Sequence, residues 1–172
     1  MLVQHMAALN NGKRIVLASG SPRRREILTM LGLAHEVHAS AFEENLDKGA
    51  FPTPAEYAKT NASSKMLATL SGREHSVLSA VALFTPSRSE VRDKPATVFC
   101  EHTRVRFAPL SPETIAAYIR TGEPMDKAGS YGIQGVGGSF ITGITGCYYN
   151  VMGFPLHAFT SAVARLLDAG EL

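Results

Sequence analysis

Cysteine is scarce in this chain and tryptophan is absent. The chain has two cysteines in 172 residues, Cys100 and Cys147. They are too few and too far apart in the sequence for a disulfide scaffold or a zinc site. We therefore expect two buried thiols, a reducing compartment and a cytoplasmic location.

An excess of charge of one sign and a long apolar run are also missing. The formal net charge is only +2, which disfavours a protein that coats nucleic acid, and the sequence has no basic surface interleaved with aromatic residues. No apolar run approaches the length that crosses a bilayer, and residues 1–13 lack the continuous apolar core of a secretory signal. We expect neither a nucleic-acid partner nor a membrane partner.

What is present is the composition of a globular domain. Hydrophobic residues make up 45% of the chain and charged residues 19%, so disorder is disfavoured and the chain can bury a substantial core. We expect an N-terminal extension over residues 1–12 and a single domain over residues 13–170.

The pattern of elements predicts an α/β fold with a mixed sheet and helices packed on it. Apolar or alternating runs predict strands, and capping signals followed by periodic apolar residues predict helices. The strands are expected over residues 14–18, 36–39, 75–84, 97–107 and 139–144, and the helices over 22–31, 54–70, 112–120 and 156–167, with a turn-rich connection over 146–153.

The stretch Ser19–Arg25 joins the first expected strand to the first expected helix. Ser21 is placed as the N-cap and Pro22 as the first helical residue. The arginines Arg23–Arg25 then lie in the first turn, where the helix dipole already has its positive end. An anion bound there would remove this conflict, since free N–H groups and guanidinium groups would all face it. The stretch is either a phosphate-binding turn or a solvated basic patch.

Two further features have more than one interpretation. Glu43 and Glu44 lie in an acidic loop and are either solvated charges or ligands of a divalent metal. Lys65 lies among small residues on an expected helix and is either a surface lysine or a lysine that reaches into a cleft.

A glycine-rich stretch follows the helix that ends near Gly122. Five glycines lie between residues 129 and 138, where they would let the backbone approach a ligand and present its N–H groups. Lys127 offers a positive charge, and Gln134 offers a donor and an acceptor that could contact the edge of a base. The alternative is a glycine-rich hairpin loop without a ligand.

Three stretches resemble signatures of the Maf family of nucleotide pyrophosphatases. They are Leu17–Arg24 near the N-terminus, Asp126–Gly135 in the glycine-rich region and Asn150–Pro155 near the C-terminus. Leu70–Val77 is similar to a fourth family segment. The resemblance covers nearly the whole chain, and within the family it points to the dTTP/UTP-directed branch, which includes an animal form fused to a methyltransferase-like domain.

The resemblance implies a fold and an activity. The fold would be a mixed twisted sheet with flanking helices and a central nucleotide-binding cleft of the Maf/ITPase type. The enzyme would be a hydrolase that converts dTTP, UTP or modified pyrimidine triphosphates to the monophosphate and pyrophosphate, with Mg²⁺ or Mn²⁺ as cofactor.

The resemblance also assigns roles to individual residues. It matches Glu44 with an acidic catalytic residue that holds the metal, and Lys65 with a catalytic lysine of the cleft. The residues that it matches with substrate binding are Ser19, Arg23 and Arg24 for the phosphates, and Lys127 and Gln134 for the second signature, the glutamine being linked to base selection.

The chain departs from the family between Lys65 and Gly72. Family members carry a strand ending in Gly-Ala-Asp-Thr, a loop with Lys-Pro and another helix at this place, whereas here the sequence runs straight across. That aspartate is the family's presumed general base, and removal of a general base typically slows a reaction by ~10²–10⁴-fold. Two functions therefore remain open: an active pyrophosphatase, or a catalytically impaired isoform that binds nucleotide or acts as a regulatory module. A homodimer is left open as its assembly.

Overall fold

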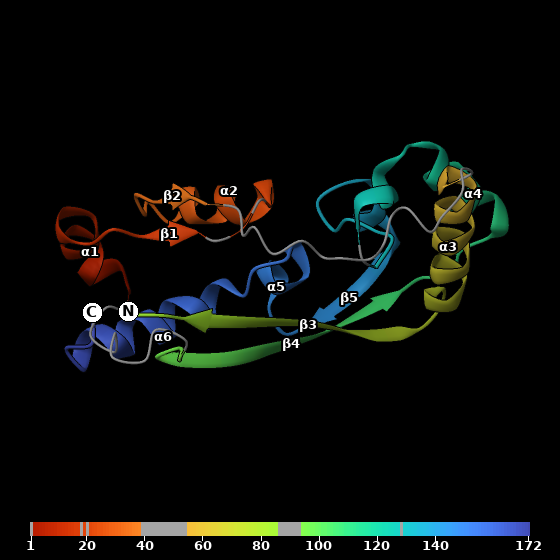
Figure 1. Ribbon diagram of the computed structural model, residues 1–172. Coiled ribbons are helices and arrows are strands. Elements are labelled where there is room, and N and C mark those ends of the chain that lie inside the picture. The colour runs from red at the N-terminus through yellow and green to blue at the C-terminus, as the bar shows by residue number, and fades with distance from the viewer. Residues whose placement is uncertain (1, 18, 20, 39–54, 86–93, 128) are drawn as a thin grey trace. The chain divides into compact units, whose positions relative to one another are not determined.

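The computed structural model describes residues 2–17, 19, 21–38, 55–85, 94–127 and 129–172. These residues fall into two compact units (Figure 1). Unit 1 comprises residues 1–42, 78–102 and 147–172, and unit 2 comprises residues 43–77 and 103–146. Two long strands, β3 (Glu74–Leu83) and β4 (Thr97–Phe107), contribute residues to both units.

Unit 1 begins with short elements in the order η1 (Leu2–His5), α1 (Met6–Gly12), β1 (Val16–Leu17), α2 (Pro22–Met30) and β2 (Glu36–Val37). Strands β1 and β2 pair in parallel, with Val16 opposite Glu36. The crossover helix α2 buries Ile27 and Leu28, as its apolar spacing predicts. The expected strand 14–18 is therefore present, but its paired part is short.

The first twelve residues pack onto unit 1. Leu9 of α1 is only 3% exposed. The amide of Asn10 donates a hydrogen bond to the Gly32 carbonyl (2.9 Å), and its oxygen accepts one from the Ala34 amide (2.9 Å). These contacts fix α1 to the turn that follows α2.

Unit 1 ends with α5 (Tyr148–Met152) and α6 (Leu156–Asp168). The apolar face of α6 is buried through Phe159, Ala162, Val163 and Leu166, which confirms the closing helix. The turn-rich connection expected over 146–153 instead contains α5. Asn150 of α5 is fully buried and donates to the Glu101 carbonyl at 3.3 Å, so a tertiary contact stabilises a helix that has no strong sequence signal.

Unit 2 contains α3 (Ala55–Leu70), α4 (Pro112–Arg120), η4 (Glu123–Asp126), η5 (Val136–Phe140) and β5 (Ile141–Thr145). Helix α4 packs against α3. The start of α4 follows the sequence prediction: Ser111 is the N-cap, and its side chain accepts a hydrogen bond from the Thr114 amide at 3.2 Å.

The antiparallel sheet has the order β3-β4-β5. The amide of Ala96 donates to the Leu83 carbonyl and that of Phe107 to the Arg73 carbonyl, so β3 and β4 run in opposite directions. Within β4, the alternation confirms the prediction, because Thr103, Val105 and Phe107 are buried while Arg104 and Arg106 are exposed.

The chain has the predicted α/β architecture, with parallel and antiparallel strands and flanking helices. Within the described residues these strands form two sheets, β1-β2 and β3-β4-β5, rather than one mixed sheet. Parallel neighbours need a crossover connection, which α2 supplies between β1 and β2.

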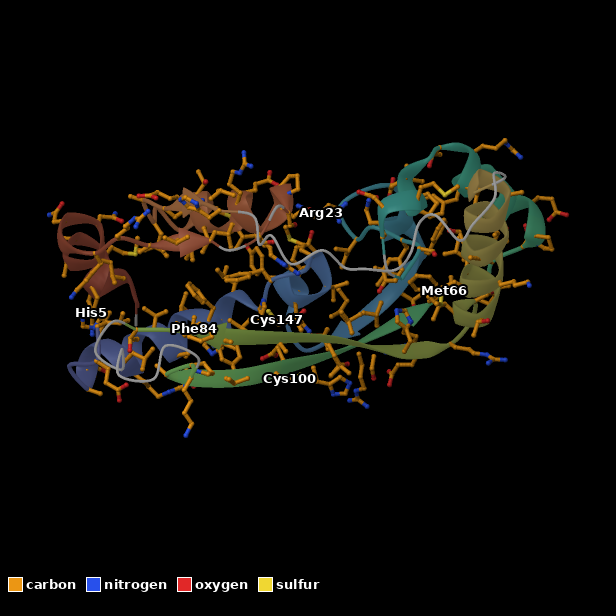
Figure 2. All side chains as sticks on the ribbon, viewed as in Figure 1. His5, Arg23, Met66, Phe84, Cys100 and Cys147 are labelled. Carbon is orange, nitrogen blue, oxygen red and sulfur yellow. The ribbon has the colours of Figure 1, made fainter. Side chains whose placement is uncertain are left out.

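Two further features of the structure are the exposure of the cysteines and the length of the apolar helices. Cys100 on β4 is exposed and Cys147 is partly exposed (Figure 2), so the prediction that both thiols are buried is wrong: Cys100 lies on the outward-facing set of the alternating strand. None of the helices in the described part of the chain is long and apolar enough to cross a membrane.

Candidate functional site

The arginine-bearing turn lies in unit 1, at the start of α2. Ser21 is the N-cap and Pro22 the first helical residue, as predicted. The Ser21 side chain, however, forms no capping hydrogen bond, and the first turn contains no acidic residue. The first N–H groups of a helix have no partner within the helix, so this helix start presents donors and positive charge together.

Arg24 connects the turn to neighbouring segments through two hydrogen bonds. Its Nη1 donates to Ser19 Oγ (3.0 Å), and its Nε donates to the Gly153 carbonyl (3.2 Å). Ser19 Oγ also accepts from the Ser21 amide at 3.3 Å. The guanidinium of Arg24 thus connects the turn after β1 to the end of α5.

Arg23 differs from Arg24. It lies at the N-terminal end of α2 (Figure 2) and is partly exposed. Its guanidinium makes no hydrogen bond or ion pair with the part of the chain that the structure describes. Of the two arginines, Arg24 therefore uses its donors to hold the turn, whereas Arg23 makes no such contact with the described residues.

A cavity of about 1040 Å³ adjoins the turn within unit 1. Ser19, Arg24 and Gly153 form a polar part of its wall. The rest is largely apolar and comes from β1, from residues 78–83 of β3 and from Phe159, Val163 and Leu166 of α6. Ligand sites are typically apolar pockets with a few polar groups, and this cavity has that character.

Carboxylates near the turn do not assemble a cation site in the described structure. Glu44, the predicted metal ligand, lies outside the described residues. Glu36 accepts hydrogen bonds from Arg14 at 2.8 and 3.1 Å and lies 3.1 Å from His38, and these contacts lower its pKa to about 2. The described residues contain no group of three His, Cys, Asp or Glu side chains that could hold a metal ion.

Lys65 lies on α3 in unit 2, and its side chain is exposed. The buried face of this helix carries Ser63 and Leu67, which are 6% and 0% exposed. Ser63 accepts a hydrogen bond from Ser130 Oγ at 3.3 Å, which connects α3 to the glycine-rich segment. Of the two interpretations of Lys65, its exposure within unit 2 agrees with that of a surface lysine.

Lys127 and Gln134 both belong to unit 2. The Lys127 side chain is only 9% exposed. Its ammonium donates to the Glu123 carbonyl (3.0 Å) and pairs with the carboxylate of Asp126. Gln134 is exposed. The Gln134 side chain is therefore accessible to solvent, whereas the Lys127 ammonium is bonded to the chain itself.

Glu123 is the residue of this region that sequence reasoning missed. Its carboxylate accepts hydrogen bonds from the amides of Val136 (2.9 Å) and Gly137 (3.2 Å) and from the hydroxyl of Tyr118 (2.9 Å). Burial favours the neutral acid, but these donors, with the charge of Lys127, outweigh it and lower the pKa of Glu123. The only sequence signal is an acid near a glycine-rich stretch, which does not identify its partners.

The glycines of this stretch make room for Glu123. A Cβ at Gly135 would overlap the Glu123 carboxylate, and one at Gly137 would lie 2.5 Å from the Tyr118 hydroxyl oxygen. The group that approaches the backbone closely at these glycines is a carboxylate of the chain itself. The amides of Val136 and Gly137 are occupied by a carboxylate of the protein.

Aromatic residues of unit 2 pack against the beginning of the same segment. Tyr131 packs edge-on against His75 and Phe107, with ring centroids 5.5 and 4.8 Å away, and its hydroxyl lies 2.9 Å from His75 Nε2. Burial raises the pKa of Tyr131 to about 12 and lowers the pKa of His75. Both rings are therefore neutral near pH 7, and they anchor the beginning of the glycine-rich segment in the core of unit 2.

The described structure thus sorts the predicted residues into two groups. Ser19, Arg23 and Arg24 gather at one turn of unit 1, and Lys127 and Gln134 belong to one internally bonded segment of unit 2. Lys65 belongs to unit 2 as well, on α3, and its side chain is exposed.

Comparison with known proteins gives a family match. The profile of the family described as Maf-like protein matches residues 14–69 and 58–166. A Homo sapiens protein named "Probable bifunctional dTTP/UTP pyrophosphatase/methyltransferase protein" is 38% identical over 199 residues, which include 90% of this chain and 32% of the relative. The chain therefore spans about a third of that relative's length.

Bacterial relatives are matched over most of their length. A protein of Anaeromyxobacter sp. is 40% identical over 181 residues, with 83% of this chain and 84% of the relative covered. One of Clostridium perfringens is 37% identical over 191 residues, with 87% and 95% covered. Both carry the name "dTTP/UTP pyrophosphatase".

The same comparisons locate a missing segment. The alignments extend over 199, 181 and 191 residues, more than the 172 of this chain, although none includes the whole chain. The relatives therefore contain residues without a counterpart here. The two profile matches share residues 58–69, which make up most of α3, so the join between the two matched parts lies in or near this helix.

Proposed function

The chain belongs to the Maf family, and from this premise we propose that it is a nucleoside triphosphate pyrophosphatase directed to dTTP, UTP or modified pyrimidine nucleotides. The reaction is hydrolysis between the α- and β-phosphates: water adds to the α-phosphorus, the bond to the bridging oxygen breaks, and the monophosphate and pyrophosphate leave. The single observation that carries the proposal is the turn at α2, with Arg23 open beside Ser19 and Arg24.

Each predicted residue has a role in this proposal. Arg23 binds phosphate oxygens through its guanidinium, and Arg24 holds Ser19 in place while adding positive charge. Gln134 contacts the base, and Lys127 positions the segment that carries it. Glu44 and Lys65 keep the catalytic roles that the family resemblance implies. Residues 13–170 act as one Maf-like domain.

The cofactor that the resemblance implies is Mg²⁺ or Mn²⁺. The described carboxylates do not supply a donor set for it, since Glu36 is engaged by Arg14 and Glu44 lies outside the described residues. The metal site is therefore proposed on Glu44 alone, and the roles above involve only side chains of this chain. The cytoplasm as location and a homodimer as assembly are proposed on the same footing.

A second function is favoured by the missing segment. The Gly-Ala-Asp-Thr sequence is absent from the chain, and the comparisons indicate residues without a counterpart near the end of α3. A chain without the family's presumed general base could bind nucleotide through the α2 turn and turn it over slowly or not at all. It would then act as a nucleotide-binding or regulatory isoform.

The test is to incubate the purified full chain with dTTP, UTP, CTP and ATP and Mg²⁺ and to follow pyrophosphate release. Binding of the same nucleotides is titrated in parallel on the wild type, Arg23→Ala and Arg25→Ala. Arg25 is the matched control, because it is an exposed arginine of the same helix turn. Loss of one charged contact predicts binding weaker by about 10- to 100-fold for Arg23→Ala.

The outcomes separate the two functions. Turnover well above background excludes the impaired isoform. Binding that depends on Arg23 without turnover supports the isoform. If the wild type neither binds nor hydrolyses any of the nucleotides, both functions are wrong.

A further inference from the structure

Backbone N–H groups in a glycine-rich segment are usually available to water or to a ligand. In unit 2, those of Val136 and Gly137 donate to the Glu123 carboxylate instead. That of Gly132 donates at 3.2 Å to the hydroxyl of Tyr118, which in turn donates to Glu123. The Glu123 carboxylate thus bonds to the backbone on both sides of residues 133–135, directly at Val136 and Gly137 and through Tyr118 at Gly132.

The segment can accept this carboxylate only where it has glycine. A Cβ at Gly135 would overlap the carboxylate, and a Cβ at Gly132 would lie 3.1 Å from Glu123 Oε1 and 2.9 Å from Lys127 Cε. Contacts this short are incompatible with a larger residue unless a neighbour moves. The glycines and Glu123 therefore specify one shape together.

Gln134 lies at the exposed tip of that shape. Its neighbours on either side are fixed: Gly132 through Tyr118, and Val136 directly by Glu123. Turn hydrogen bonds from the Gly135 amide to the Gly132 carbonyl (3.3 Å) and from Gly138 to Gly135 (3.0 Å) add to the constraint. A fixed backbone sets the position of the Gln134 Cα–Cβ bond and the χ1 rotamers that are allowed, and so limits where its amide can lie.

Discrimination between bases by a side-chain amide depends on direction, since hydrogen bonds weaken steeply away from linear geometry. We propose that Glu123 is a positioning residue, which holds the glycine-rich segment in shape and through Gln134 sets the preference for uracil over cytosine. The inference rests on the proposed function, where Gln134 contacts the base. Glu123 itself touches no substrate.

The experiment compares the wild-type chain with Glu123→Gln and with Glu113→Gln as matched control. Glu113 is an exposed glutamate of unit 2 at the start of α4. The dissociation constants of UTP and CTP are measured by calorimetry, and the ratio of the two is the readout. This ratio does not depend on the fraction of active protein, so a loss of folded protein leaves it unchanged.

For Glu123→Gln we expect the preference for UTP over CTP to fall by about three- to tenfold, the effect of one misdirected hydrogen bond. Hydrogen exchange at the amides of Val136 and Gly137 should become faster in the same variant. The control should change neither readout. An unchanged ratio in Glu123→Gln, with a clear preference in the wild type, overturns the inference and leaves the proposed function in place.

A wild type that binds no nucleotide overturns the proposed function, and the inference with it. Tyr118→Phe keeps the measurement possible if Glu123→Gln fails to fold. This change removes the hydroxyl between Glu123 and Gly132 and keeps the ring that packs edge-on against Phe140 at 4.9 Å. Its UTP/CTP ratio should lie between those of the wild type and Glu123→Gln, and a wild-type ratio contradicts the inference.

Discussion

Two helices of this protein begin with the same Ser-Pro pair and differ in the capping and the charge of their first turns. At the start of α4, Ser111 caps the Thr114 amide, and an acidic residue, Glu113, occupies the first turn. At the start of α2, Ser21 forms no side-chain cap, and arginines occupy the first turn. The start of α4 thus has a capping hydrogen bond and an acid in its first turn, whereas the start of α2 has no side-chain cap and carries positive charge.

The same contrast extends to the surrounding segments. The glycine-rich segment of unit 2 has its amides taken by Glu123 and Tyr118. In the turn of unit 1, Arg24 bonds Ser19 and Gly153, whereas Arg23 makes no hydrogen bond with the described residues. Glycines, prolines and charged residues alone do not separate a ligand site from a self-contained one; the partners of the N–H groups do.

The largest effect expected from this difference is stabilisation of the folded chain by an anion bound at the start of α2. Pyrophosphate at about 100 times its dissociation constant should stabilise the chain by about 2.7 kcal/mol by mass action, read as a rise in melting temperature. Arg23→Ala should lose most of this rise and Arg25→Ala should keep it. An equal rise in all three proteins would contradict an anion site at Arg23.

Packing at the glycine-rich segment should give the next largest effect. In Gly137→Ala, the new Cβ meets the Tyr118 hydroxyl at 2.5 Å and the Gly132 backbone at 3.0 Å. We expect a loss of about 1–3 kcal/mol in the free energy of unfolding, as for other overpacked sites.

Gly143→Ala is the control for this packing prediction. Its Cβ would meet only the end of the Arg106 side chain, at 3.2 Å, which can move aside. Urea denaturation should show little change for this variant. Equal losses in both variants would argue against the close contact at Gly137.

The two serines test the helix starts directly. Ser111→Ala removes an observed cap and should cost about 1 kcal/mol of the free energy of unfolding. Ser21→Ala removes no capping bond and should stay within about 0.5 kcal/mol, as expected of a substitution away from a cap. Chemical denaturation of both variants gives the comparison, and a larger loss for Ser21→Ala would reverse it.

The smallest effect concerns pH. The hydrogen bonds to Glu123 lower its pKa in the folded state, so the folded state binds that proton less readily than the unfolded state. Its contribution to stability is complete above the unfolded pKa, about 4.3, and is lost as the pH falls through the lower folded value. The difference in melting temperature between the wild type and Glu123→Gln should therefore shrink from pH 7 to pH 3, and a constant difference would contradict this.

Much of the fold follows from local sequence patterns. The strands β3 and β4 and the helices α2, α4 and α6 lie where alternation, periodicity and capping signals place them, because such signals act within a few residues. Helix α5 was missed, since its formation depends on the buried Asn150 bonding to the distant Glu101.

The candidate site was predictable in part. The spacing of Ser21, Pro22 and the arginines predicts the helix start and its charge. It does not reveal that Arg24 turns toward Ser19 and Gly153 while Arg23 stays open, since Gly153 lies 129 residues away along the chain.

The sequence by itself determined the long strands, most of the longer helices, the family and the arginine turn, because these depend on residue types at short spacings. Only the tertiary structure decided which N–H groups remain for a ligand. A carboxylate can take the amides of residues 13 and 14 positions away only after the chain has folded back on itself and glycines have allowed it to approach. The different contacts of Glu123 and Arg23 therefore arise through folding.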